Sequence, residues 1–128
     1  MASRGRILVI DNEPDILEVV SIYFDEGGYE VITAPDGTEG LALAEQHHPD
    51  VVLLDIRMPG LSGLDVLSLM RMRWPRLPVI MLTAVVDVEL AKGTLRRGSF
   101  DYVRKPFDLH HLHRRVAAAL ARHSAQAS

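Results

Sequence analysis

Residues 50–60 read Asp-Val-Val-Leu-Leu-Asp-Ile-Arg-Met-Pro-Gly, in which four apolar residues are closed by Asp55. A short run that is apolar throughout is typical of a strand buried on both faces, as in the parallel sheets of α/β proteins. In open sheets of that kind, ligands bind beyond the carboxyl ends of the strands. Asp55 stands at such an end, so its carboxylate is the first candidate for chemistry.

Two more apolar runs end in polar residues. Residues 7–10 (Ile-Leu-Val-Ile) are followed by Asp11, Asn12 and Glu13, and residues 79–82 (Val-Ile-Met-Leu) are followed by Thr83 and Ala84. If the three runs are parallel strands of one sheet, their polar ends lie at the same edge. The sequence therefore predicts acids and a hydroxyl group close to Asp55.

The whole chain alternates between short apolar runs and segments patterned for helices. The runs are at 6–10, 29–33, 50–54, 78–82 and 100–103, and the helical segments start near Pro14, lie around 37–47, 63–73 and 86–97, and resume after Asp108. This alternation predicts an α/β fold with a doubly wound, five-stranded parallel sheet joined by right-handed crossovers. The chain is too short for an eight-fold barrel. Periodicity alone leaves the strand order open.

Spacings of three and four predict which helical residues face the core. These residues are Ile16, Leu17, Val20 and Phe24 in the first helix, Leu64, Leu67 and Met70 in the third, Val88, Ala91 and Leu95 in the fourth, and Leu109, Leu112, Val116 and Ala119 in the last. Asp108 is a suitable N-cap for the last helix.

Composition narrows the class of protein. The chain has 128 residues, of which 48% are hydrophobic and 24% charged, as expected for one globular domain. A formal charge of -3 gives no electrostatic reason to bind nucleic acid. No apolar stretch approaches the roughly 20 residues that span a bilayer. Without cysteine there is no disulfide or thiolate metal site, and the polar start lacks a signal peptide's apolar core, so a cytoplasmic location is expected.

The motifs together resemble the receiver domain of two-component response regulators. The resemblance runs from Arg6 to about Arg122 and rests on residues 7–15 (Ile-Leu-Val-Ile-Asp-Asn-Glu-Pro-Asp), 51–60, 82–84 and 100–107 (Phe-Asp-Tyr-Val-Arg-Lys-Pro-Phe). It implies a flavodoxin-like (βα)5 fold with strand order 2-1-3-4-5, in which the first and third strands are neighbours. We therefore expect a receiver domain at 1–122 and a flexible tail, or the start of a linker, at 123–128.

The resemblance implies that Asp55 accepts a phosphoryl group from a histidine kinase or another phosphotransfer protein, with Mg²⁺ or Mn²⁺ as cofactor. The implied metal ligands are Asp11, Asn12, Asp55 and the backbone carbonyl of Arg57, with Glu13 as a further candidate. The chemistry agrees, because an aspartate accepts a phosphoryl group only where a metal, a cation and hydrogen-bond donors neutralise the transferring charge.

The remaining implied site residues bind the phosphoryl group and transmit its presence. We expect Thr83 and Ala84 to hydrogen-bond the phosphoryl oxygens, Lys105 to pair with them, and the Lys105–Pro106 peptide bond to be cis. Tyr102 is expected to turn in behind Thr83 and to reshape the surface of the fourth helix, fifth strand and fifth helix. The resemblance further implies that this surface controls a downstream protein or a covalently linked output domain and can form a homodimer. Singly, each residue also has a structural interpretation, such as a strand end, a solvated lysine or a half-buried aromatic.

Asn12 departs from the family, which usually has a second acid at this position. An amide oxygen can ligate Mg²⁺ but brings no charge, and a unit charge at ~5 Å and an effective dielectric of ~20 is worth about 3 kcal/mol. We therefore expect weaker metal binding than with two acids. Glu13 can replace the missing carboxylate, although beside Pro14 it equally suits the first turn of a helix, which is the interpretation we favour.

The family tunes the lifetime of the phosphoryl group at two positions, occupied here by Arg57 and Val85. Neither side chain is an acid or an amide that orients an attacking water, so slow self-dephosphorylation is expected.

Three other functions compete with this interpretation. A pseudo-receiver, which binds a partner constitutively without phosphorylation, is kept open by Asn12 and opposed by Asp55, Thr83 and Lys105. An aspartyl phosphatase would need a second aspartate where Arg57 stands. A flavin or dinucleotide carrier would need a glycine-rich loop after the first strand, and residues 11–14 contain no glycine.

Overall fold

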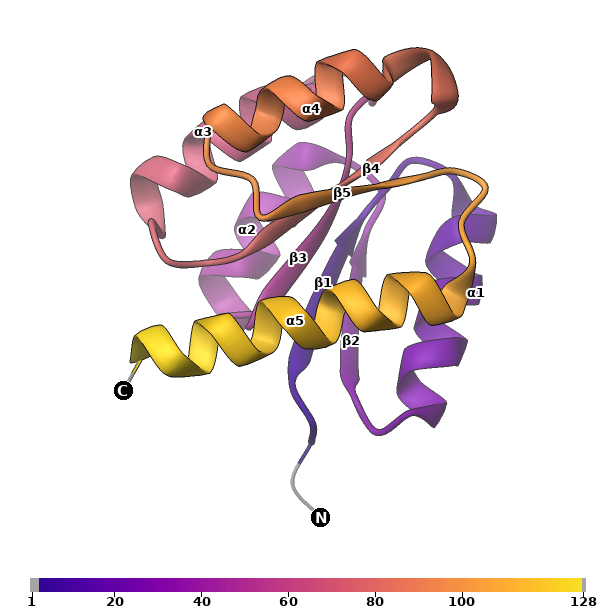
Figure 1. Ribbon diagram of the computed structural model, residues 1–128, viewed down its shortest axis with the longest axis vertical. Coiled ribbons are helices and arrows are strands. Elements are labelled where there is room, and N and C mark those ends of the chain that lie inside the picture. Colours follow the sequence, from indigo (N-terminus) through magenta and orange to yellow (C-terminus); the bar gives the residue numbers. More distant parts are fainter. Residues whose placement is uncertain (1–2, 128) are drawn as a thin grey trace.

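The computed structural model describes the backbone of residues 3–127 and the side chains of residues 3–124 (Figure 1). It contains one parallel sheet in the order β2-β1-β3-β4-β5, which confirms the fold class and the strand order. The strands are β1 (Arg6–Ile10), β2 (Glu30–Ala34), β3 (Val51–Asp55), β4 (Val79–Thr83) and β5 (Asp101–Arg104). The helices are α1 (Pro14–Glu26), α2 (Gly37–His47), α3 (Gly63–Arg73), α4 (Val88–Arg96) and α5 (Leu109–Ala127), with a 3-10 turn η1 (Val85–Asp87) before α4.

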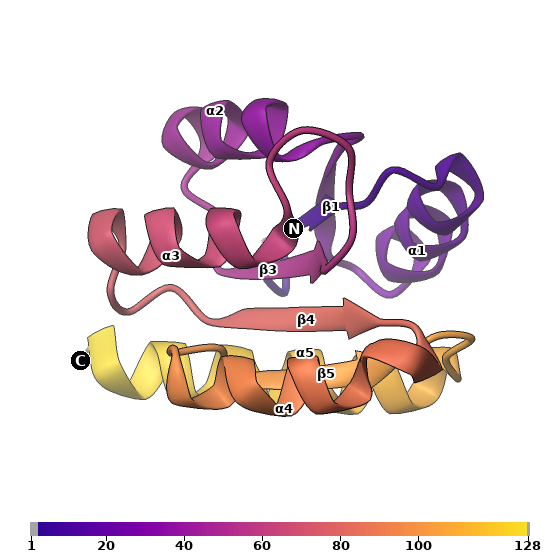
Figure 2. The same ribbon diagram turned by 90° about the horizontal axis from the view of Figure 1, so that it is seen from above.

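Two hydrophobic clusters sandwich the sheet. Leu8 and Ile10 of β1 face the cluster formed with α2, α3 and α4, whereas Ile7 and Val9 face the cluster formed with α1 and α5. Figure 2 shows β3 and β4 side by side in the middle of the molecule, and every residue of these two strands is buried. The continuous apolar runs of the sequence are therefore strands covered by helices on both faces.

Most of the helical residues predicted to face the core do so. Val20, Phe24, Leu67, Met70, Ala91, Leu112, Val116 and Ala119 are buried. The prediction for Leu95 is wrong, because this side chain is 43% exposed and Thr94 is buried in its place. Thr94 tolerates burial because its hydroxyl donates to the Ala91 carbonyl oxygen at 2.6 Å and lies 2.8 Å from Ser99 Oγ.

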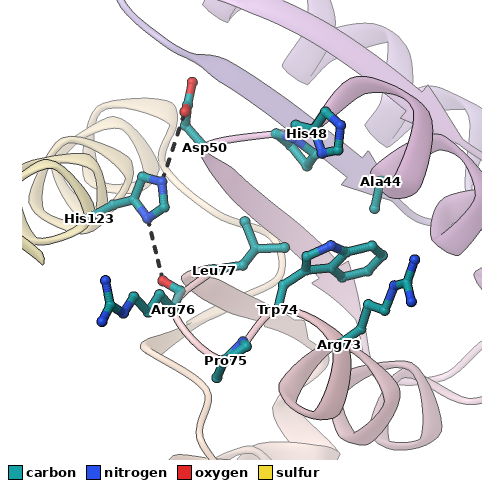
Figure 3. Close-up of a pocket in the computed structure, with 10 residues that line it drawn as sticks. Ala44, His48, Asp50, Arg73, Trp74, Pro75, Arg76, Leu77 and His123 are labelled. Atoms are coloured by element: carbon teal, nitrogen blue, oxygen red, sulfur yellow. Dashed lines mark hydrogen bonds and ion pairs between the residues drawn. The ribbon is translucent and has the colours of Figure 1, made fainter. Parts of the chain in front are cut away.

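Residues 123–127, part of the segment expected to be a flexible tail or the start of a linker, continue α5, which ends at Ala127. Residues 116–127 are rich in alanine and contain neither glycine nor proline, which favours continuation of α5. His123 also contacts the body of the domain, with Nδ1 3.4 Å from the Arg76 carbonyl oxygen and Nε2 4.0 Å from Asp50 (Figure 3). Residue 128 lies outside the described residues.

The cavity in Figure 3 has a volume of 490 Å³ and lies between the end of α2, the loop before β4 and the end of α5. Trp74 and Leu77 form an apolar wall of it. Since the loops before β3 and β4 line this cavity, it lies at the amino ends of these strands, opposite to the edge that ends in Asp55. It is therefore separate from the polar strand ends that the sequence singled out.

Among the described residues, no helix combines the length and the apolar character needed to cross a membrane.

The start of α3 is fixed close to the end of β3. Ser62 and Asp65 form a reciprocal capping box, and the Gly63 amide donates to the Ile56 carbonyl oxygen at 2.7 Å. A Cβ atom on Gly63 would lie 2.1 Å from the Asp55 carbonyl oxygen. Only glycine allows this approach, so the short loop that follows Asp55 is held tightly.

Replacing Gly63 with alanine should therefore destabilise the protein, because the clash is with backbone that cannot turn aside. We expect Gly63→Ala to lower the free energy of unfolding by about 1–3 kcal/mol in urea denaturation. Gly93→Ala is the matched control, since nothing lies within 4 Å of a Cβ on this residue of α4. The control should gain roughly 0.5–1 kcal/mol. Equal stability of Gly63→Ala and the wild type would contradict the proposed tight approach.

Candidate functional site

The carboxyl ends of four neighbouring strands bring the predicted residues to one edge of the sheet. Ile10 pairs with Leu54 in the β1–β3 register, so Asp11 and Asp55 follow neighbouring positions. Thr83 ends β4, and its carbonyl oxygen accepts a hydrogen bond from the Lys105 amide at 2.7 Å. Segments distant in the sequence thus contribute an acid each from β1 and β3, a hydroxyl from β4 and an ammonium from beyond β5.

A single ammonium group stands among three carboxylates. Lys105 Nζ lies 2.7 Å from Asp11 Oδ2, 3.1 Å from Glu13 Oε1 and 3.5 Å from Asp55 Oδ1. Asp11, Asp55 and Lys105 are largely or completely buried, whereas Glu13 is exposed. The other carboxylate oxygen of Asp11 accepts a hydrogen bond from the Glu13 amide at 2.9 Å. We refer to Asp11, Glu13 and Asp55 as the acid cluster.

Glu13 lies outside α1, which begins at Pro14. Its backbone is extended and its side chain makes no capping hydrogen bond. The carboxylate is instead paired with Lys105, so the structure places Glu13 in the acid cluster and not in the first helical turn that we favoured from the sequence.

The acid cluster fits a hard divalent cation. One oxygen from each of its carboxylates can be chosen so that all three atoms lie within 4.8 Å of one another. Mg²⁺ and Mn²⁺ prefer oxygen ligands of this kind, and three carboxylates against one ammonium leave an excess of negative charge. Asn12 is exposed and lines a 410 Å³ hollow with residues of the β3–α3 loop, including Pro59 and Gly60.

Burial and neighbouring charges shift the proton equilibria of the site. Burial raises the pKa of Asp55 to about 6, the charge of Asp11 adds to this rise, and Lys105 opposes it. Burial disfavours the ammonium of Lys105, but hydrogen bonding and attraction from Asp11 outweigh it and raise the pKa of Lys105. Lys105 is therefore charged at neutral pH. The ionised form of Asp55 is disfavoured by burial and by repulsion from Asp11, and a bound cation would stabilise it.

Of the phosphoryl-binding and switch candidates, Lys105 contacts the acid cluster directly, and the others follow or lie on the neighbouring strands β4 and β5. Thr83 is buried, and its hydroxyl donates to the Ala84 carbonyl oxygen at 3.1 Å. Ala84 is exposed, with extended backbone, at the start of η1. Tyr102 is half-buried on β5 against the cluster formed with α2, α3 and α4. The Lys105–Pro106 peptide bond is cis.

Arg57 and Val85, the candidates for tuning phosphoryl lifetime, have different surroundings. Val85 is exposed in η1. The guanidinium of Arg57 forms two hydrogen bonds of 2.7 Å with the carboxylate of Asp87, which is buried. Sequence reasoning missed Asp87. The one available signal was an acid within the otherwise apolar segment 85–88, which needs a partner if it is buried.

Comparison with known proteins agrees with this geometry. Residues 7–117 match the family model of the response regulator receiver domain. The chain is 45% identical over 120 residues to the regulatory protein AtoC of Escherichia coli (strain K12), covering 94% of this chain and 26% of AtoC. It is 44% identical over 121 residues to the transcriptional regulatory protein KdpE of Mycobacterium tuberculosis (strain ATCC 25618 / H37Rv), covering 94% of this chain and 53% of KdpE.

The fold is equally close to solved structures. The crystal structure of a response regulator receiver domain protein from Clostridium thermocellum superposes with a TM-score of 0.91 at 35% sequence identity, covering 95% of this chain and 98% of that one. This chain therefore corresponds to nearly the whole of that receiver structure, whereas it spans between a quarter and about half of the two curated relatives described above.

The raised pKa of Asp55 predicts a pH-dependent stability in the absence of metal. The protonated form is favoured in the folded state, so the stability it contributes is present at low pH and is lost as the pH rises through about 6. In EDTA at pH 8, Asp55→Asn should be more stable than the wild type by about 1–3 kcal/mol, because the amide carries no charge. The difference should shrink below pH 6.

Urea denaturation of both proteins between pH 5 and pH 8 measures this difference. Asp25→Asn, at an exposed position in α1, is the control and should show no such trend. A stability difference between Asp55→Asn and the wild type that does not change with pH would contradict the raised pKa.

Proposed function

This chain belongs to the response regulator receiver domain family, and on that basis we propose that Asp55 accepts a phosphoryl group from a histidine kinase or another phosphotransfer protein. Receiver domains are signalling domains and not classical enzymes. The observation that carries the proposal is the buried Asp55 carboxylate between Asp11 and Lys105, at the meeting point of four strand ends. The family resemblance supplies the reaction, and these contacts supply its chemical setting.

The chain's own residues supply most of the groups that the transfer needs. An oxygen of ionised Asp55 forms a bond to phosphorus, and the phosphorus–nitrogen bond to the donor histidine breaks, which leaves an acyl phosphate. Lys105 is placed to pair with the transferred oxygens, and Thr83 and the Ala84 amide are donors for them. When bound, Mg²⁺ or Mn²⁺ supplies the positive charge that offsets the phosphoryl oxygens.

The proposed metal ligands are Asp11, Asp55 and the backbone carbonyl of Arg57, with Asn12 or Glu13 completing the protein's contribution. The acid cluster supports Glu13, because its carboxylate already lies with those of Asp11 and Asp55. Its exposure suits a ligand that contacts the cation directly or through a water molecule.

The proposed output follows from the position of the phosphoryl group. Movement of Thr83 toward the group would let Tyr102 turn inward and change the surface of α4, β5 and α5. That surface would control a partner protein, a linked output domain or homodimerisation, in the cytoplasm. The relatives include proteins named as transcriptional regulators, but this chain matches only a part of them.

Asn12 favours a second candidate function, that of a pseudo-receiver which binds its partner without phosphorylation. The second acid usual in the family is missing at this position. The acid cluster weighs against this alternative, since Glu13 provides a third carboxylate there.

Phosphorylation can be tested by intact mass after incubation with acetyl phosphate. We expect the wild type to gain one phosphoryl group in the presence of Mg²⁺ and none in EDTA, and Asp55→Asn to gain none. The group should be lost slowly, because Arg57 and Val85 offer no acid or amide to an attacking water. No gain of mass with Mg²⁺ would refute the proposed function, and a half-life of seconds would refute the slow loss.

The contribution of Asn12 can be tested by calorimetric titration with Mg²⁺. Asn12→Asp adds a carboxylate beside the acid cluster, so we expect about 5-fold to 30-fold tighter binding once hydration offsets part of the attraction. Glu13→Gln should bind more weakly than the wild type. Unchanged affinity in Asn12→Asp would show that position 12 does not face the cation.

A further inference from the structure

An ion pair connects the loop that follows β3 with the segment that follows β4. Arg57 Nε donates to Asp87 Oδ2 and Arg57 Nη2 donates to Asp87 Oδ1, both at 2.7 Å. The Asp87 side chain is only 5% exposed, whereas the Arg57 side chain that covers it is 73% exposed. A planar guanidinium that donates two parallel hydrogen bonds is the strongest and most directional form of this contact.

The ion pair joins two segments that each follow a residue of the proposed site. Arg57 follows Asp55 by two residues, in the loop between β3 and α3. Asp87 follows Thr83 by four residues, at the end of η1. The pair therefore ties the loop that follows the proposed acceptor to the segment that follows the proposed phosphoryl-binding hydroxyl.

Asp87 occupies the N-cap position of α4 but does not cap the helix. Its side chain makes no capping hydrogen bond, and its ψ of 11° is far from extended. Asp36 and Ser62, which cap α2 and α3 with their side chains, have ψ values of 169° and 162°. An aspartate caps a helix well only with an extended backbone, so Asp87 cannot cap α4 and hold Arg57 in the observed geometry at once.

The same segment determines where the hydroxyl of Thr83 points. The Ala84 carbonyl oxygen accepts from Thr83 Oγ1 at 3.1 Å and from the Asp87 amide at 3.0 Å. The second of these bonds closes the η1 turn that presents Asp87 to Arg57. The turn, the ion pair and the Thr83 hydroxyl therefore form one connected arrangement.

The two valines of the η1 turn are not buried by the packing of this segment. Val85 and Val86 are exposed, so burial of these side chains contributes little to holding the segment in place. Its described anchors include the Arg57–Asp87 pair, the two bonds to the Ala84 carbonyl oxygen and the bond from the Val88 amide to the Val85 carbonyl oxygen. An element held in this way can exchange between two discrete arrangements.

We propose that the Arg57–Asp87 ion pair is a latch that positions the segment between β4 and α4. With the latch closed, as observed, Thr83 donates to Ala84. With the latch open, η1 unwinds, Asp87 extends to cap α4, and the Thr83 hydroxyl is released toward Asp55. The link to phosphoryl transfer rests on the function proposed above. Arg57 and Asp87 are positioning residues, since they act through Thr83 and the loop backbone.

Amide hydrogen exchange in the unphosphorylated protein tests the latch directly. Arg57→Ala removes the pair and leaves Asp87 able to cap, Asp87→Ser can cap but cannot pair, and Asp87→Ala can do neither. In the first two variants the Asp87 amide should exchange faster, and the amides of Glu89 and Leu90, at the second and third positions of α4, should exchange more slowly. In Asp87→Ala the amide of residue 87 should exchange faster, whereas the amides of Glu89 and Leu90 should gain no protection, because no cap forms.

Arg73→Ala is the matched control, because it breaks the exposed ion pair between Arg73 and Glu45 on α3 and α2. It should leave the exchange of α4 unchanged. If Arg57→Ala exchanges like the wild type at Asp87, Glu89 and Leu90, the latch is refuted. The same holds if Arg57→Ala and Asp87→Ala give identical patterns, because then Asp87 does not become a cap.

Phosphorylation by acetyl phosphate provides the second readout. Arg57→Ala and Asp87→Ser should each react about 3-fold to 10-fold faster than the wild type, because more of the population is open. The double variant should react no faster than either single variant, because one latch can be opened only once. The proposal would be overturned if both single variants reacted more slowly than the wild type. It would also be overturned if the rate increase in the double variant were the product of the increases in the two single variants.

Failure of the latch and failure of the proposed function give different results. If the wild type never gains a phosphoryl group, the proposed function fails, while the exchange measurement still decides whether Asp87 moves between Arg57 and α4. If the wild type is phosphorylated but the exchange patterns do not differ among the variants, the latch alone fails.

Discussion

The contact between Lys105 and the buried carboxylates of Asp11 and Asp55 is the constraint on which the site depends. The parallel register of β1 and β3 forces the two acids together at the edge of the sheet. Like charges in a buried location repel strongly, which is part of the reason why the pKa of Asp55 is raised. Lys105, which follows β5, offsets part of that repulsion, so the charge balance of the site requires the outer strand to be in place.

Most of the fold could be predicted because apolar runs and helical spacings are local properties of the sequence. The strands agree with the predicted runs to within one residue, and the capping box at Ser62 begins α3 where the pattern places it. The errors concern properties that depend on the surroundings. Thr94 replaces Leu95 in the core because Ala91 and Ser99 satisfy its hydroxyl.

The residues of the candidate site also fall into those that local sequence predicts and those that depend on the surroundings. Asp11, Asp55 and Thr83 could be placed because each ends or follows a predicted strand, and strand ends meet at one edge. Lys105 is placed by the resemblance to the receiver family. Glu13 and Asp87 could not be assigned, because their surroundings are set by partners far away in the sequence. Lys105 is 92 residues from Glu13, and Arg57 is 30 residues from Asp87. Only the folded structure shows which way these two carboxylates turn.

The direction of the Arg57 side chain affects the charge balance of the acid cluster. A guanidinium two residues from Asp55 has an obvious alternative, which is to neutralise the acid cluster and occupy the place of a cation. The guanidinium is instead bonded to Asp87, whose two carboxylate oxygens each accept one hydrogen bond from it. Lys105 is then left to balance three carboxylates, and the excess negative charge remains available to a divalent ion. The Arg57–Asp87 pair thus engages the guanidinium that could otherwise neutralise the acid cluster.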